Sequence, residues 1–75
     1  MKVIKSQDGK HIWNPKHVRS AWVERSQDGV MLRIRAEVQG GRVVTLREVN
    51  SYELVGAEDY IARQFEIIEE AMNYG

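Results

Sequence analysis

A β-hairpin is predicted by residues 18–38, which read VRSAWVERSQDGVMLRIRAEV. Apolar and polar residues alternate on both sides of Asp28-Gly29, a pattern typical of strands that bury one face. The Asp-Gly pair favours a two-residue type I′ turn, in which both central residues adopt a positive φ. We therefore place two strands at about residues 18–26 and 30–38.

The turn also sets the register of this hairpin, so that Val23 lies opposite Ile34 and Trp22 lies opposite Arg35. Side chains of a strand point alternately to its two faces, and the register therefore sorts them into two groups. The group expected to face the core is Ala21, Val23, Leu32, Ile34, Ala36 and Val38. The group expected to face outward is Trp22, Glu24, Met31, Arg33, Arg35 and Glu37.

A third long strand is expected at about residues 42–49, after a glycine turn at residues 39–41. A three-residue loop, with its last glycine in the left-handed conformation, is favoured over a two-residue loop. Only the longer loop places Leu46 opposite Ile34 on the core face, whereas the shorter loop would place Arg47 there. The three strands then form an antiparallel meander.

A shorter hairpin is predicted near the N-terminus, with strands at about residues 2–6 and 10–13. The four letters SQDG at residues 6–9 recur at residues 26–29, and we interpret them as one hairpin turn used twice. The Asn-Pro pair at residues 14–15 ends the second strand, because proline has no amide hydrogen and disfavours helix in the residue before it. This hairpin is expected either to extend the sheet or to fold over its end.

A C-terminal helix is predicted at about residues 51–73. Its apolar face repeats every three or four positions and consists of Leu54, Ala57, Ile61, Phe65, Ile68 and Met72. Asn50 and Glu53 resemble a capping box at the start of that range, whereas Gly56 favours a later start at Ala57. The predicted fold is α+β, an antiparallel β-meander of four to five short strands with one C-terminal helix packed on one face.

The chain has 75 residues, which we expect to form one small domain over residues 1–75. It has no cysteine and only two histidines, His11 and His17. It shows no nucleophile–base set at motif spacing, no phosphate-binding glycine loop and no metal-ligand pattern. We therefore expect no enzymatic activity, no catalytic residues, no metal and no cofactor.

Charge is unevenly distributed along the chain, although the net charge is zero. Residues 1–47 carry ten basic and four acidic residues, whereas residues 48–75 carry one basic and seven acidic residues. No apolar run has the length of a signal peptide or a membrane span. We expect a soluble, unprocessed, cytoplasmic protein that does not bind a membrane.

The outward face of the sheet is the predicted interaction surface, because it combines aromatic and basic residues. The candidate residues are Trp22, Met31, Arg33, Arg35, Thr45, Arg47, Trp13 and Arg19. The leading hypothesis is a non-enzymatic interaction or assembly module that forms a homo-oligomer or binds another protein. The alternative is a small nucleic-acid-binding protein, in which arginines contact phosphates and tryptophan stacks on a base.

Four short segments form a further pattern: Gly9-Lys10, the Asn-Pro turn, the strand VVTLRE at residues 43–48, and SYELV at residues 51–55. Together they resemble the small bacterial motility-associated proteins of the FlbD or SwrD type. The pattern extends over about residues 9–72, but the middle hairpin is longer here and the helix is more acidic. The resemblance implies a non-enzymatic bacterial accessory protein that acts by contact and has no catalytic residues; small phage proteins share this outline.

Overall fold

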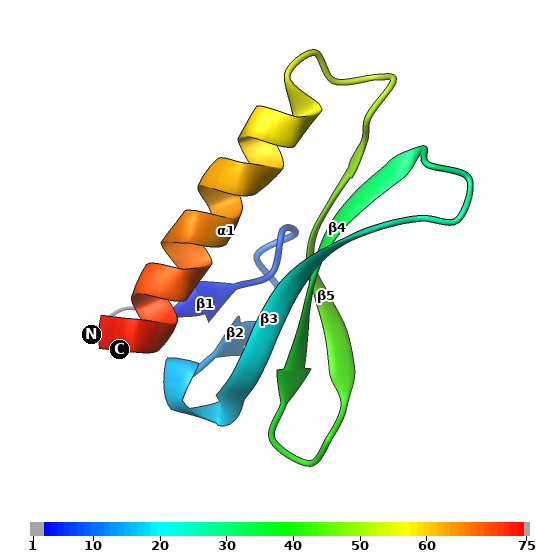
Figure 1. The fold of residues 1–75 in the computed structure, drawn as a ribbon. Coiled ribbons are helices and arrows are strands. Elements are labelled where there is room, and N and C mark those ends of the chain that lie inside the picture. Colours follow the sequence, from blue (N-terminus) through cyan, green and yellow to red (C-terminus); the bar gives the residue numbers. More distant parts are fainter. Residues whose placement is uncertain (1–2, 75) are drawn as a thin grey trace.

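Two antiparallel sheets and one helix make up the fold in the computed structural model, which describes residues 3–74 (Figure 1). This α+β architecture confirms the predicted fold class. The N-terminal sheet pairs two short strands, and the second sheet has the order β3-β4-β5. The elements in chain order are β1 (Ile4–Lys5), β2 (Ile12–Trp13), the 3-10 turn η1 (Pro15–His17), β3 (Val18–Arg25), β4 (Met31–Val38), β5 (Val43–Asn50) and α1 (Ala57–Tyr74).

The register of β3 on β4 is the predicted one. Trp22 lies opposite Arg35, and Val23 lies opposite Ile34. The next turn is also as predicted, because the amide of Val38 donates to the carbonyl of Arg42 at 2.8 Å across a three-residue loop. Local turn geometry and alternation are therefore sufficient to align the first half of the sheet.

Two β-bulges interrupt this regular register, and the predicted pairing of Leu46 with Ile34 was wrong because of the one in β5. In β5 the bulge lies between Thr45 and Arg47, so that Arg47 lies opposite Ile34 although the loop has three residues. In β3 the bulge lies at Arg19. A bulge adds one residue to one strand and reverses the phase of the side chains that follow. It therefore brings Val49 to the inner face of β5, opposite Leu32.

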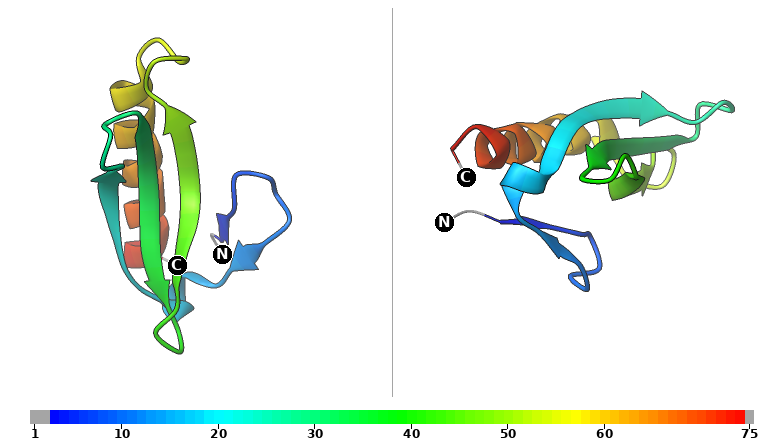
Figure 2. Two further views of the ribbon diagram at one scale, coloured as in Figure 1. Left: turned by 90° about the vertical axis from the view of Figure 1, so that its right-hand side faces the viewer. Right: turned by 90° about the horizontal axis from the view of Figure 1, so that it is seen from below.

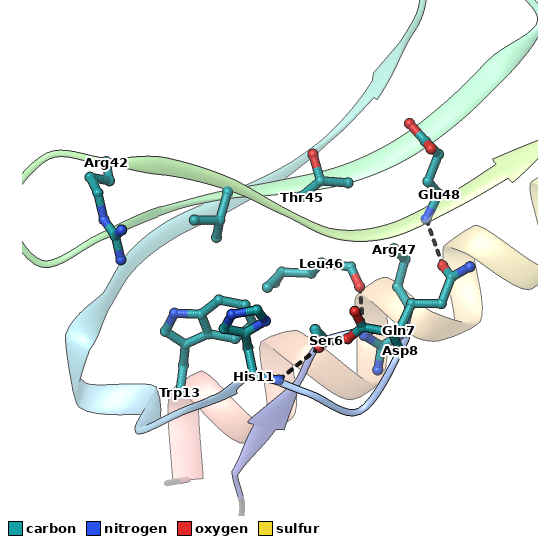
Figure 3. Close-up of a pocket in the computed structure, with 11 residues that line it drawn as sticks. Ser6, Gln7, Asp8, His11, Trp13, Arg42, Thr45, Leu46, Arg47 and Glu48 are labelled. Carbon is teal, nitrogen blue, oxygen red and sulfur yellow. Dashed lines mark hydrogen bonds between the residues drawn. The ribbon is translucent and has the colours of Figure 1, made fainter.

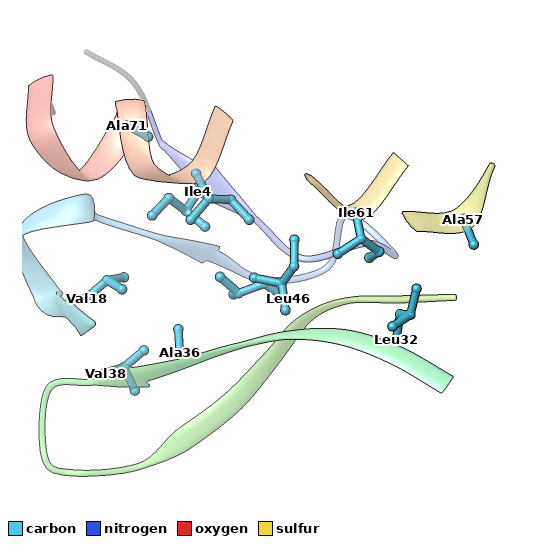
Figure 4. Packing of buried hydrophobic residues seen from close by; sticks show 11 residues of the cluster. Ile4, Val18, Leu32, Ala36, Val38, Leu46, Ala57, Ile61 and Ala71 are labelled. Atoms are coloured by element: carbon cyan, nitrogen blue, oxygen red, sulfur yellow. The ribbon is translucent and has the colours of Figure 1, made fainter. Parts of the chain in front are cut away.

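The core lies between the inner face of the three-stranded sheet and α1 (Figure 4). Ile34, Leu46 and Ile61 are its largest fully buried side chains. Alternate residues of β4 are buried along the whole strand, which confirms the predicted inward positions there. Val23 was also predicted to face the core, but 45% of it is exposed because α1 does not cover that part of β3.

The helix begins at Ala57, the later of the two starts considered from the sequence. Gly56 has a φ of 77°, which L-residues rarely adopt, so the chain turns sharply before the helix. Asn50 does not cap α1; its side chain accepts the amide of Tyr52 at 2.9 Å and stabilises a turn. Leu54 consequently lies outside the helix and is exposed, whereas Ala71 joins the buried face.

The N-terminal hairpin forms its own sheet beside β5 and does not extend the sheet of β3, β4 and β5 (Figure 2). Ile4 on its inner face is buried in the core, and Trp13 packs against the same cluster. Asn14 caps η1 by accepting the amide of Lys16 at 2.9 Å, which confirms the predicted turn. Both strands are shorter than predicted, and residue 2 lies outside the described part of the chain.

The two SQDG segments form the same hydrogen-bonded turn. The hydroxyls of Ser6 and Ser26 donate to the carboxylates of Asp8 and Asp28, respectively, at 2.5 Å in each copy. Each carboxylate also accepts the amide two residues later, and each hydroxyl accepts the amide five residues after the serine. Only the glycine of each Asp-Gly pair has a positive φ, so the predicted type I′ geometry was wrong. The interpretation as one turn used twice holds.

These bonds predict that the two turns weaken in acid. The serine hydroxyl, followed by the backbone amide, lowers the pKa of both Asp8 and Asp28 below the ordinary value of 3.8. An aspartate whose pKa is lower in the folded than in the unfolded protein stabilises the fold at pH values above its pKa in the unfolded protein. This stabilisation is lost as the pH falls through its pKa in the folded protein. In urea unfolding, Asp28→Asn should therefore be less stable than the wild type at pH 7, and this difference should shrink below a pH of about 4.

Gln27→Ala in the same turn is the control, because neither side chain titrates. The difference in free energy of unfolding between Gln27→Ala and the wild type should not change with pH. If the free energies of unfolding of the wild type and Asp28→Asn differ by the same amount at pH 7 and at pH 3, the carboxylate bonds do not stabilise the turn.

Candidate functional site

The outer face of the sheet brings together part of the predicted interaction surface. Trp22, Arg35 and Thr45 form one row across the three strands, since Arg35 lies opposite both of the others. Met31 and Arg33 lie on the same face of β4, because they alternate with its buried residues. These side chains are half-buried, except for that of Thr45, which is exposed.

Carboxylates on the same face pair with its arginines. Glu48 forms a hydrogen-bonded ion pair with Arg33, and this bond raises the pKa of the Arg33 guanidinium. Glu24 lies 3.9 Å from Arg35 and accepts the indole N–H of Trp22 at 3.3 Å. Both arginines are therefore already close to negative charge. Nucleic-acid binding stays a prediction, and this arrangement disfavours it because a phosphate would have to compete with the glutamates.

The other three predicted surface residues lie elsewhere. Arg19 is exposed in the bulge near the start of β3. Trp13 belongs to the N-terminal hairpin, where its ring stacks on His11 with 5.9 Å between the ring centres. Arg47 is turned out of the outer row by the bulge in β5. The prediction that Arg47 projects together with Trp22, Arg33, Arg35 and Thr45 was therefore wrong.

Arg47 holds the N-terminal hairpin and the helix against β5 (Figure 3). Its Nη1 donates to the carbonyl of Lys5 at 2.5 Å and to that of Leu46 at 2.7 Å, while its Nε donates to the Gln64 side chain at 3.1 Å. Beside it, the Gln7 side chain accepts the amide of Glu48 at 2.8 Å. The bulged arginine therefore connects three elements that are distant in sequence.

A groove of about 560 Å³ lies between the hairpin and β5 (Figure 3). Its apolar parts are Val44, Leu46 and the stacked rings of His11 and Trp13. Its polar rim consists of Ser6, Gln7, Asp8, Arg42, Thr45, Arg47 and Glu48. Its volume is within the range of ligand pockets, and its lining is more polar than that of most such pockets.

The groove contains serine, aspartate and histidine side chains, but their bonds are those of a turn. The Ser6 hydroxyl donates to Asp8 and accepts the backbone amide of His11, while the His11 ring stacks on Trp13. The second SQDG turn makes the same bonds with Met31 at the position equivalent to His11. Because the same turn forms with methionine in place of the histidine, we assign Ser6, Asp8 and His11 a structural role.

Sequence reasoning missed the groove because its two walls are 29 or more residues apart in the chain. One local signal was present: Ile4 and Trp13 lie opposite each other, and their face of the hairpin continues through Ser6 and His11. This signal identifies the inner face of the hairpin. It does not indicate that the hairpin lies beside β5.

No protein-family model, no curated protein and no solved structure matches this chain. The resemblance to FlbD- or SwrD-type proteins therefore stays a prediction. Within residues 3–74, no group of three or more His, Asp or Glu side chains is placed to hold a metal ion. No helix in the same part of the chain combines the length and the apolar character that crossing a membrane requires.

Replacing Arg47 by methionine should loosen the hairpin, because methionine keeps the aliphatic packing but donates no hydrogen bonds. We expect the free energy of unfolding to fall by about 1–3 kcal/mol, because the hydrogen bonds of a charged guanidinium to Lys5, Leu46 and Gln64 are lost. The amide of Glu48, bonded to Gln7, should also exchange its hydrogen faster in the native state.

Arg42→Met is the matched control, since Arg42 directly precedes the same strand and has an exposed side chain. It should change the free energy of unfolding by less than about 0.5 kcal/mol. Equal costs for the two substitutions, or unchanged exchange at Glu48, would contradict the role of Arg47.

Proposed function

We propose that this protein is a non-enzymatic interaction module that self-associates by pairing the free edge of β3 with the same edge of a second copy. The observation that carries the proposal is a strand edge that pairs with no other strand of residues 3–74 and lies next to an exposed apolar side chain. β3 has eight residues, contains no proline and lies at the end of the sheet. Such an edge is a template for another strand.

The free hydrogen-bonding groups of this edge follow from the register. The amide of Ser26 donates to the carbonyl of Met31 at 2.9 Å, so this is a hydrogen-bonded pair. Hydrogen-bonded and non-hydrogen-bonded pairs alternate in antiparallel strands. The backbone groups of Ala21, Val23 and Arg25 therefore point away from β4. They form a row of donors and acceptors available to a neighbouring strand.

A second copy fits this edge when Val23 lies opposite Val23 of the second copy. In that register the two-fold axis passes through a hydrogen-bonded pair, and both exposed valines become covered. Trp22 then lies opposite Glu24 of the second copy, and Ala21 lies opposite Arg25 of that copy. No like charges face each other across this pairing, which favours the register.

The small size of the domain also supports association. A chain of this length buries a limited fraction of its surface, and pairing two sheets edge to edge extends the ladder of hydrogen bonds. The bulge at Arg19 twists the start of β3, so pairing should be confined to its second half. This part of the strand contains Val23.

Replacing Val23 by cysteine tests the proposal, because the chain has no cysteine of its own. A hydrogen-bonded cross-strand pair has a Cα separation of about 5.5 Å, which a disulfide can bridge. Mild oxidation of Val23→Cys should therefore give mostly covalent dimers. Val23→Lys should weaken the association of the unoxidised protein about tenfold or more in sedimentation equilibrium, because an edge lysine opposes strand pairing.

Ala62→Cys, on the exposed side of α1, is the matched control and should form dimers much more slowly. The proposal is wrong if the protein sediments as a monomer at every concentration tested at low salt. It is equally wrong if the two cysteine variants form covalent dimers at the same rate, because the disulfide would then report random collision.

A further inference from the structure

We infer that the groove between the N-terminal hairpin and β5 binds an extended peptide segment with an acidic side chain, which adds as a strand to the open part of the β5 edge. This surface lies at the edge of the sheet opposite to β3. It does not depend on self-association, so either proposal can fail without the other.

The β5 edge is covered along one half only. Near the bulge, Arg47 donates to the carbonyl of Leu46, and Gln7 accepts the amide of Glu48, so side chains already occupy these backbone groups. Val38 and Arg42 form a hydrogen-bonded pair, which directs the backbone groups of Val43 and Thr45 away from β4. Within residues 3–74, neither Val43 nor Thr45 forms a hydrogen bond on that side.

The open half of the edge lies directly on the groove. Arg42, Val44 and Thr45 line the groove on the β5 side, and the stacked rings of His11 and Trp13 line it on the hairpin side. A strand added at Val43 and Thr45 would send alternate side chains toward these rings. Main-chain bonds would supply affinity, and the aromatic wall would accept one apolar side chain.

The charge around the open edge favours an acidic peptide. Arg42 is exposed and forms no ion pair with any residue of the described chain. The groove carboxylates are occupied, because Asp8 accepts bonds within its turn and Glu48 pairs with Arg33. Arg42 is therefore the cation free to bind a carboxylate, in a bidentate pair with directional preference.

The test uses acetylated and amidated pentapeptides of alternating valine and threonine, with one glutamate moved through all five positions. Each peptide has a lysine counterpart. In ¹H–¹⁵N spectra, at least one glutamate peptide should shift the amides of Val43 and Thr45 and the indole N–H of Trp13 in a saturable way. Its lysine counterpart should bind about tenfold more weakly or worse, because like charges would meet at Arg42.

Two variants and one modified peptide separate the contributions. Arg42→Glu should weaken the best glutamate peptide about tenfold, whereas Arg19→Glu, an exposed arginine near the other edge, should leave its affinity unchanged. Methylating the peptide nitrogen that faces Val43 or Thr45 should also weaken binding about tenfold, since one main-chain donor is lost. Val23→Lys, which blocks the β3 edge, should bind the peptide as the wild type does.

Three results would overturn the inference. The first is that no peptide of the set shifts these amides up to its solubility limit. The second is that methylated and unmethylated peptides bind equally, which would make the groove a side-chain pocket without strand addition. The third is that the shifts fall on β3, which would place peptide binding on the edge proposed for self-association.

Discussion

Burial of every second side chain of β4 beneath α1 is the interaction on which the other contacts depend. β4 is the central strand, and its inner residues contact both neighbouring strands and the helix. The helix packs against all three strands but leaves Val23 of β3 45% exposed. The same packing that stabilises the core therefore produces the exposed valine beside a free edge. Stability and the proposed assembly surface have one structural origin.

The bulge in β5 has the widest consequences of any local feature. The residues of this strand that pack in the core are Val44, Leu46 and Val49, and a regular strand cannot direct all three inward because the last interval is odd. One extra residue solves this conflict and brings Glu48 to the outer face, where it pairs with Arg33. It also turns Arg47 toward Lys5 and Gln64. The one extra residue thus allows Glu48 to pair with Arg33 on the outer face and Arg47 to bond to the N-terminal hairpin.

The two edges of the sheet are protected to different extents. Proteins usually cover or charge such edges, since unpaired backbone groups invite strands of other molecules. On β5, Gln7 and Arg47 occupy the groups near the bulge, while Val43 and Thr45 stay open beside an aromatic wall. On β3, the bulge at Arg19 and the charged side chains of Glu24 and Arg25 give partial protection, while the backbone groups of Ala21 and Val23 stay open. The arginines of the outer face are already paired with glutamates. The proposed functions therefore use the unprotected segments of the two edges.

The sequence alone determined the elements whose contacts are local. Turn residues and alternation defined the register of Trp22 against Arg35, and the 3.6-residue period identified the helix, although its capping-box start was six residues too early. The odd spacing between Leu46 and Val49 could have predicted the bulge. The hydrogen bonds of Arg47 could not be predicted, since the bond to Lys5 joins residues 42 positions apart. Only tertiary packing decided where the hairpin docks and hence where the groove lies, because neither alternation nor turn chemistry specifies contacts at that separation.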